Sequence, residues 1–303
     1  MKANFAVFLI LAMFAPVYCT GATKDELESM WDAQRTALQS VVIRCRTVRR
    51  QTPETTNLGR DEVRKLLEAK DLSVDEGALK DVAHRLDPTL SGVERAWTDG
   101  EIIFDVDSVR KDITFEGITR SHVWHRDLQL IKEPRNKQVK MTLRANSSIE
   151  IPEIEDFVYM PPQGATKRLT VEAKDGGRLI LSIGNRMIDV DSDTGFVREY
   201  RLGDYETGKK YWEVLQFGIT TYGPVAAPAW RFDGEYVRKR LHSFTLRVLD
   251  EIDLGGVTDA EFAVSAEPGS VVVDRRGERK IRRIKEPSVD VSTIELDQAT
   301  DKE

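Results

Sequence analysis

The chain after residue 23 opens with apolar positions at helical spacing. Apolar side chains recur three and four residues apart, charged side chains stand between them, and the first turn is acidic. The apolar positions are Leu27, Met30, Trp31, Leu38, Val41 and Val42. The spacing predicts an amphipathic helix of about four or five turns.

From Val41 the pattern changes to a period of two. One side of this segment would carry Val41, Ile43, Cys45 and Thr47, and the other side Arg44, Arg46 and Arg50. Because side chains alternate across a strand, the helix should lead directly into a first strand with arginines on its outer side. Cys45 then reads as a buried small residue, with a free thiol as the alternative.

A polar loop over residues 51–60 separates this strand from two short helical patterns. The apolar stripe of the first pattern is Val63, Leu66 and Leu67. The second pattern begins with Ser73 and Glu76, spaced as a capping box, and ends at Asp87-Pro88. We interpret residues 60–87 as a helical insertion between strands.

Between about residue 93 and residue 250 the pattern is almost wholly that of strands. The turn sequences between apolar runs are Asp175-Gly176-Gly177, Gly184-Asn185 and Asp193-Thr194-Gly195. Such sequences between alternating runs are strong hairpin signals. Consecutive hairpins predict an antiparallel sheet of roughly eight to eleven strands, and at that size a sheet curls into a sandwich or barrel. The fold class is therefore mainly β with some α.

The first residues resemble a secretory signal peptide. Lys2 precedes an apolar run from Phe5 to Val17, and the small residues Thr20 to Ala22 follow it. We expect residues 1–22 to be such a signal, which places the mature protein in the periplasm or outside the cell. An uncleaved membrane anchor and lipid modification of Cys19 are the alternatives. The run is short for a membrane span, and no later stretch of 18 apolar residues follows.

Composition excludes several classes of protein. The 303 residues hold 45 basic and 51 acidic side chains, a formal net charge of −6, so we do not expect nucleic acid as a partner. Two cysteines form neither a disulfide framework nor a four-ligand zinc site. Residues 277–303 are expected to be a charged, disordered tail, and the basic run from Arg275 to Lys285 has binding to anionic headgroups as its alternative role.

Candidate catalytic and metal-binding patterns are weak. Asp189, Asp191 and Asp193 are spaced like the start of a calcium loop, but the sixth and twelfth positions lack its glycine and glutamate. His122 and His125 would fall on opposite faces of a strand. We find no glycine-flanked nucleophile, phosphate loop or dinucleotide fingerprint. No metal, cofactor or catalytic residue is therefore predicted; a hydrolase with carboxylates that converge in space stays as an alternative.

The strands carry a heavy aromatic load. We single out Phe104, Trp124, Phe217 and Phe244 as candidates to line an apolar cavity. Filling a solid core is the alternative role for the same side chains.

Four stretches resemble the outer-membrane lipoprotein-sorting, or LolA-like, family. The first is Leu27-Glu28-Ser29-Met30-Trp31 through Arg44-Cys45-Arg46, a tryptophan-bearing helix that leads into a strand. The others are Ile188-Asp189-Val190-Asp191 through Thr194-Gly195-Phe196-Val197-Arg198, Tyr222-Gly223-Pro224 through Ala227-Pro228, and Asp253-Leu254 through Asp259-Ala260-Glu261-Phe262 to Pro268-Gly269-Ser270-Val271-Val272-Val273-Asp274. Together they cover most of residues 24–276. The resemblance implies a LolA-like half-barrel domain over residues 23–276.

What the resemblance implies is a half-open antiparallel barrel, closed by helices, whose apolar cavity takes acyl chains. It implies a periplasmic carrier of lipids or lipoproteins, with envelope membrane proteins as further partners and no enzymatic activity. We assign the lid to residues 60–87, a helical pair longer than the lid loops usual in the family. The family's lid-closing arginine has no matching position here, since Arg44 and Arg46 would face outward. An envelope sensory or scaffolding regulator of the same fold is the alternative.

Overall fold

A computed structural model gives the fold of this protein. It describes residues 22–51, 56–69, 76–88, 97–115, 117–143, 154, 157–175, 177–285 and 288–291. The expected signal peptide and the residue Ser73 of the expected capping box lie outside these ranges. Within them, no helix is long and apolar enough to cross a membrane.

The α-helices of the described residues are short. They are α1 (Lys24–Ala37), α2 (Arg60–Glu68) and α3 (Glu76–Leu86). Helix α1 begins at Thr23, where the side chains of Thr23 and Glu26 form a capping box. The predicted amphipathic helix and helical insertion are confirmed, although the helix ends before Val41, which already belongs to the first strand.

The strands alternate with tight turns along most of the chain. They are β1 (Ser40–Gln51), β2 (Trp97–Asp105), β3 (Ser108–Phe115), β4 (Ile118–His125), β5 (Leu128–Glu133), β6 (Gln138–Leu143), β7 (Thr170–Asp175), β8 (Arg178–Ile183), β9 (Arg186–Asp191), β10 (Val197–Leu202), β11 (Tyr211–Tyr222), β12 (Val225–Val237), β13 (Arg240–Leu254), β14 (Ser265–Ala266), β15 (Val271–Asp274), β16 (Lys280–Arg283) and β17 (Val289–Asp290). Short 3₁₀ turns, η3 (Pro134–Asn136), η6 (Ala165–Arg168), η7 (Tyr205–Thr207) and η8 (Asp259–Phe262), connect some of them.

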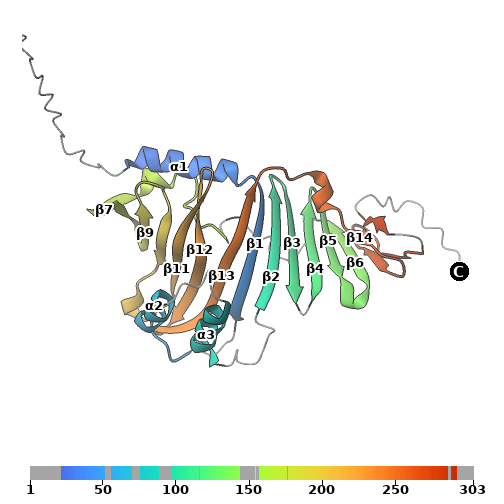
Figure 1. Ribbon diagram of the computed structural model, residues 1–303, viewed down its shortest axis with the longest axis horizontal. Coiled ribbons are helices and arrows are strands. Elements are labelled where there is room, and N and C mark those ends of the chain that lie inside the picture. Colours follow the sequence, from blue (N-terminus) through green and yellow to red (C-terminus); the bar gives the residue numbers. More distant parts are fainter. Residues whose placement is uncertain are drawn as a thin grey trace, which may run out of the picture.

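One large curled sheet forms the body of the molecule (Figure 1). Its strand order is β16-β15-β6-β5-β4-β3-β2-β1-β13-β12-β11-β10-β9-β8-β7. All neighbours are antiparallel except β15 and β6, which run parallel. The predicted fold class, a curled and unclosed antiparallel sheet with an N-terminal amphipathic helix and a helical insertion, is confirmed. The expected eight to eleven strands are too few, because this sheet has 15.

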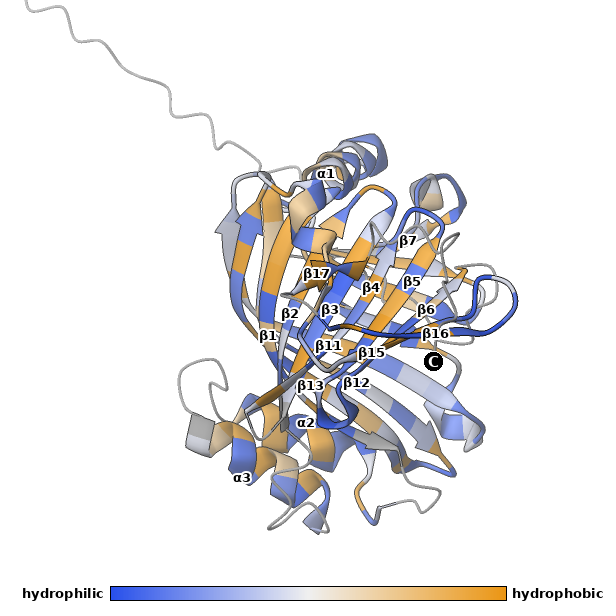
Figure 2. Ribbon diagram, turned by 90° about the vertical axis from the view of Figure 1, so that its right-hand side faces the viewer, coloured by the Kyte–Doolittle hydropathy of each residue, from blue (hydrophilic) through white to orange (hydrophobic). Residues whose placement is uncertain are grey.

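The register of the sheet assigns side chains to two faces. Val41 pairs with Phe104 and Val109 with Trp124, so these residues share what we call the first face. Ile103, Val48 and Phe244 lie on the opposite, second face. Orange and blue residues alternate along the strands in Figure 2, as two differently covered faces require.

Different segments cover the two faces. On the first face, α1 packs Leu27 and Trp31 against β8–β11, and residues 157–160 pack against β1–β4. On the second face, α2 and α3 pack against β1 and β11–β13, while residues 262–291 pack against β2–β6. Helix α1 lies at one end of the strands and the α2–α3 pair lies near the other end (Figure 1).

Residues 277–285 and 288–291 differ from the tail that the sequence predicts. Strand β16 extends the large sheet beyond β15, and β17 pairs with β14. Ile284 and Val291 are buried in the core that also holds Ile103 and Val123. Two apolar residues within a strongly charged stretch therefore fasten this segment to the sheet. Residues 292–303 lie outside the described ranges.

Candidate functional site: a helical lid and its ion-pair latch

Helices α2 and α3 cover a continuous apolar surface on the second face of the sheet. Val63 and Leu67 of α2 and Leu79, Val82 and Leu86 of α3 are at most 1% exposed. Their spacing of three or four residues places them on one side of each helix. We call these two helices the lid.

The surface beneath the lid is rich in aromatic rings. It consists of Val48, Tyr211, Leu215, Trp230, Phe232, Tyr236, Leu241, Phe244, Leu246 and Val248, with Phe217 at its margin. Phe217 and Trp230 stack with ring centroids 3.7 Å apart, and Phe232 and Phe244 stack at 6.1 Å. Large flat side chains of this kind give a broad apolar floor on strands β11–β13.

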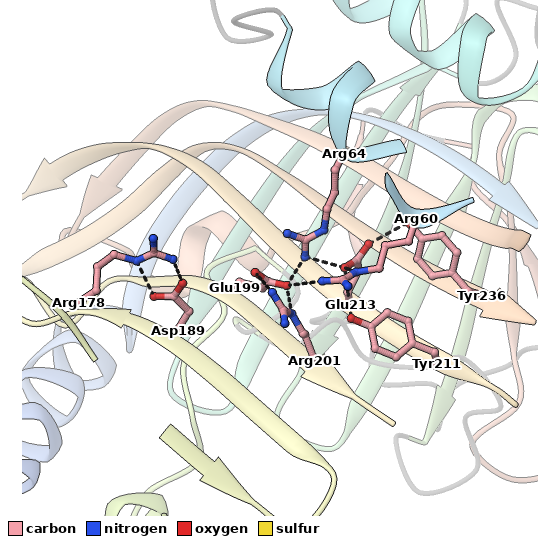
Figure 3. Close-up of polar contacts among 9 residues, drawn as sticks. All are labelled: Arg60, Arg64, Arg178, Asp189, Glu199, Arg201, Tyr211, Glu213 and Tyr236. Carbon is pink, nitrogen blue, oxygen red and sulfur yellow. Dashed lines mark hydrogen bonds and ion pairs between the residues drawn. The ribbon is translucent and has the colours of Figure 1, made fainter. Parts of the chain in front are cut away.

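A buried ionic cluster fixes α2 to this floor (Figure 3). Its centre is Glu213 on β11, whose side chain is fully buried. Arg60 Nε lies 3.0 Å and Arg64 Nη2 lies 2.8 Å from Glu213 Oε2. The Tyr236 hydroxyl donates to Glu213 Oε1 at 2.8 Å. The Tyr211 hydroxyl also donates to Glu213 Oε2, at 3.4 Å, so two helix residues and two strand residues converge on a single carboxylate.

A second carboxylate completes the cluster. Glu199 on β10 accepts hydrogen bonds from Arg201 and from Arg64, and Arg60 Nη2 lies 3.4 Å from it. Three guanidinium groups therefore face two carboxylates. We call Arg60, Arg64, Glu199, Arg201 and Glu213 the latch.

The protonation of the latch follows from burial and pairing. Burial alone raises the pKa of the Glu199 carboxyl, but the hydrogen bonds from Arg201 and Arg64 outweigh it and hold the pKa below its ordinary 4.5. Burial and the neighbouring Glu213 raise the pKa of Tyr236. At neutral pH Glu199 is therefore ionised, and the Tyr236 hydroxyl beside the latch keeps its proton.

The ion pairs have a specific mechanical consequence. A buried charge that loses its partner costs about 3–5 kcal/mol, whereas an exposed pair is worth at most about 1 kcal/mol. Arg60 and Arg64 keep about a fifth of their side chains exposed, whereas Glu213 is fully buried. The carboxylate therefore depends on α2 for its counter-charges.

The four predicted cavity residues do not share one cavity. Phe217 and Phe244 lie under the lid on the second face. Phe104 and Trp124 lie on the first face in a cluster with Phe157, and the Phe104 and Phe157 rings meet edge to face at 6.2 Å. Only the pair of Phe217 and Phe244 therefore belongs to the lid site.

Sequence reasoning missed the latch. Its signals are a glutamate among apolar side chains on one face of a strand, in the order Tyr211, Glu213, Leu215, and two arginines one helical turn apart in α2. His122 and His125 lie on opposite faces of β4, as expected: His122 contacts Trp124 and His125 stacks on Phe262. Across the described part of the chain, no three His, Cys, Asp or Glu side chains gather as a metal site would require.

Comparisons with known proteins find similarity of fold. No protein-family profile matches the chain, and no curated protein matches it. Among solved structures, a LolA superfamily protein from Nitrosomonas europaea is 8% identical, covering 80% of this chain and 97% of its own, with a TM-score of 0.41. A DUF1329 family protein from Desulfovibrio piger is 11% identical, covering 79% and 95%, with a TM-score of 0.35.

Proposed function

We propose that this protein is a carrier that binds acyl chains of lipids or lipoproteins beneath the α2–α3 lid. The observation that carries the proposal is the apolar, ring-rich floor on β11–β13, which is covered by two short helices rather than by another layer of strands. The lid is joined to the sheet through a compact ionic latch on α2. Such a cover can be displaced without disturbing the strand pairing below it.

The energies of the closed and loaded states are of similar size. An acyl chain of about fourteen to sixteen carbons gains roughly 11–13 kcal/mol on burial, at about 0.8 kcal/mol per methylene, before entropic costs. Burial of Val63, Leu67, Leu79, Val82 and Leu86 gives the lid about 8–15 kcal/mol at roughly 1.5–3 kcal/mol per side chain. The lid and an acyl chain can therefore compete for the same surface. This competition would allow the carrier both to bind its lipid and to release it.

The proposal extends to location and partners. A carrier of this kind would be exported and would work in the periplasm, exchanging acyl chains with envelope membrane proteins. The N-terminal pattern of Lys2, the apolar run from Phe5 to Val17 and small residues supports export. We propose a binding protein and assign no catalytic step to it.

The direct test is the cargo of the native protein. The chain would be purified without detergent and analysed by native mass spectrometry and organic extraction. Bound lipid or acylated peptide is the expected result. A protein that is empty and also fails to bind a synthetic palmitoylated peptide amide would overturn the proposal and leave the regulator with a protein partner as the account to pursue.

Competition between lid and lipid gives a second test with a matched control. Leu67→Ala removes buried area from the lid, so the palmitoylated peptide should bind at least about fivefold tighter. Leu179→Ala removes the same side chain from the cluster under α1 on the opposite face, where affinity should not change. Weaker binding by Leu67→Ala, measured by fluorescence titration, would show that the lid does not compete with the ligand.

A further inference from the structure

Three buried polar groups on the first face of the sheet have no hydrogen-bond partner. They are His122 Nε2, Trp124 Nε1 and Gln129 Nε2. The side chains are 8%, 1% and 3% exposed. A buried donor without a partner costs about 1–3 kcal/mol, and three at one place point to a missing binding partner.

The sheet register brings the three groups together. Trp124 on β4 stands directly opposite Gln129 on β5. His122 lies two residues from Trp124 on the same face, and their ring centroids are 5.8 Å apart. Neighbours of this kind on one sheet face lie within about 5–8 Å, so one small group can reach all three.

The surroundings favour a negatively charged oxygen ligand. Lys111 and Ile131 stand opposite His122, and Arg120 and Lys140 lie on the same face. Glu133 accepts hydrogen bonds from Arg120 and Lys140 at 3.1 Å each. Burial, assisted by Arg120 and Lys111, lowers the pKa of His122 to about 4. The imidazole is therefore neutral at pH 7 and can donate from Nε2.

An open cavity lies farther along the same face of β3–β5. The cavity measures about 350 Å³ and is bordered by Ile113, Ile118, Arg120, Glu133, Pro134 and Arg135. Ile131 stands opposite His122 on the same face and lies along β5 between Gln129 and Glu133, which borders this cavity. A cavity of this volume lies within the range of small-molecule sites.

We propose that the first face binds a carboxylate-bearing amphiphile whose carboxylate oxygens accept hydrogen bonds from Trp124 Nε1, Gln129 Nε2 and His122 Nε2. The apolar chain of the ligand lies over Ile131 toward Ile113 and Ile118. This site is on the opposite face of the sheet from the lid, so it stands independently of the proposed carrier function.

The test is a titration of the whole protein with decanoate, followed by the indole N–H resonance of Trp124 in ¹⁵N-labelled protein. The resonance is assigned with Trp124→Phe. Decanoate should shift it saturably, and 1-decanol should bind about tenfold more weakly because it lacks the charged acceptor. No saturable shift, or equal binding of the two compounds, would overturn the proposal.

Two buried glutamines on this face provide a matched pair of variants. Gln129→Leu should weaken decanoate binding about tenfold and leave the free protein at least as stable, because an unsatisfied donor is removed. Gln216 donates to the Val197 carbonyl and accepts from the Tyr159 N–H, so Gln216→Leu should lower stability and leave decanoate binding unchanged. Unchanged decanoate binding by Gln129→Leu would refute the site.

Discussion

At the scale of single residues, the decisive position is Glu213. A carboxylate on the apolar side of a strand is costly unless every lone pair is used. The partners are Arg60, Arg64, Tyr211 and Tyr236, and two of the four come from the lid helix. Glu213 would destabilise the sheet without these partners, and with them it binds α2 to the sheet.

Glu213→Gln should lower the free energy of unfolding by about 3 kcal/mol. The substitution keeps the shape of the side chain but removes one of the two buried carboxylates that Arg60 and Arg64 share, so that only Glu199 remains as their counter-charge. Equilibrium unfolding in urea measures the change. Glu101→Gln is the matched control: Glu101 pairs with the half-exposed Arg44, and the expected loss is within about 0.5 kcal/mol. Equal effects of the two substitutions would mean that the latch stabilises the fold no more than an exposed ion pair does.

Glu199 should make stability depend on pH. Its folded-state pKa lies below the ordinary 4.5, so its contribution is full above pH 4.5 and is lost as pH falls through the folded value. The difference in unfolding free energy between the wild type and Glu199→Gln should be largest at neutral pH and shrink toward zero in acid. A difference that stays constant from pH 7 to pH 3 would contradict the ionised pairing.

At the scale of elements, α1 is fixed to the β9–β10 turn by a close contact. The Trp31 indole donates to the Gly195 carbonyl at 2.7 Å. Gly195 has φ +70°, and a Cβ added there would lie 3.2 Å from Met30 Cβ. Only glycine combines this backbone conformation with so close an approach of the helix.

Gly195→Ala should therefore destabilise the protein by about 2–3 kcal/mol, from backbone strain and from crowding against Met30. Gly184→Ala isolates the backbone part, because Gly184 has φ +58° with no atom within 4 Å of an added Cβ. We expect about 1 kcal/mol there, measured by thermal or urea unfolding. Equal losses at the two glycines would show that α1 does not press on the turn.

Much of the element order could be predicted from the sequence, since helical and strand periods differ and the turn dipeptides are explicit. Pro228 and Gly234 interrupt the pattern of β12, so the bounds of this strand do not follow from its periodicity. Pro228 is tolerated where β12 pairs with β11 at Ile219, beyond the last β12–β13 pair at Trp230 and Val248. The latch also escaped prediction, because Arg60 and Glu213 are 153 positions apart and meet only through the tertiary fold.

At the scale of the whole molecule, different segments cover the two faces of one sheet. The lid and the C-terminal segment share the second face, and α1 with residues 157–160 covers part of the first. A period-two pattern does not show which segment covers which face of the sheet. Aromatic residues that line a cavity therefore cannot be distinguished in the sequence from those that fill a core. The strong charge after residue 276 likewise concealed strands β16 and β17.

Two isoleucines test whether that C-terminal segment belongs to the folded domain. Ile284 is 3% exposed and packs in the core of β2–β6, whereas Ile281, in β16, is 60% exposed. Ile284→Ala should cost about 2–4 kcal/mol and Ile281→Ala less than about 0.5 kcal/mol in urea unfolding. Similar small effects at both positions would contradict the packing of Ile284 and would support the disordered tail that the sequence predicts.

The central claim is that an acyl chain displaces the α2–α3 lid from the floor on β11–β13. Amide hydrogen exchange with and without the palmitoylated peptide amide tests it most directly, because exchange reports opening segment by segment. Bound peptide should speed exchange in residues 60–68 and 76–86 and leave the amides of β11, β12 and β13 as protected as before. Peptide that binds while α2 and α3 keep their protection would contradict the account.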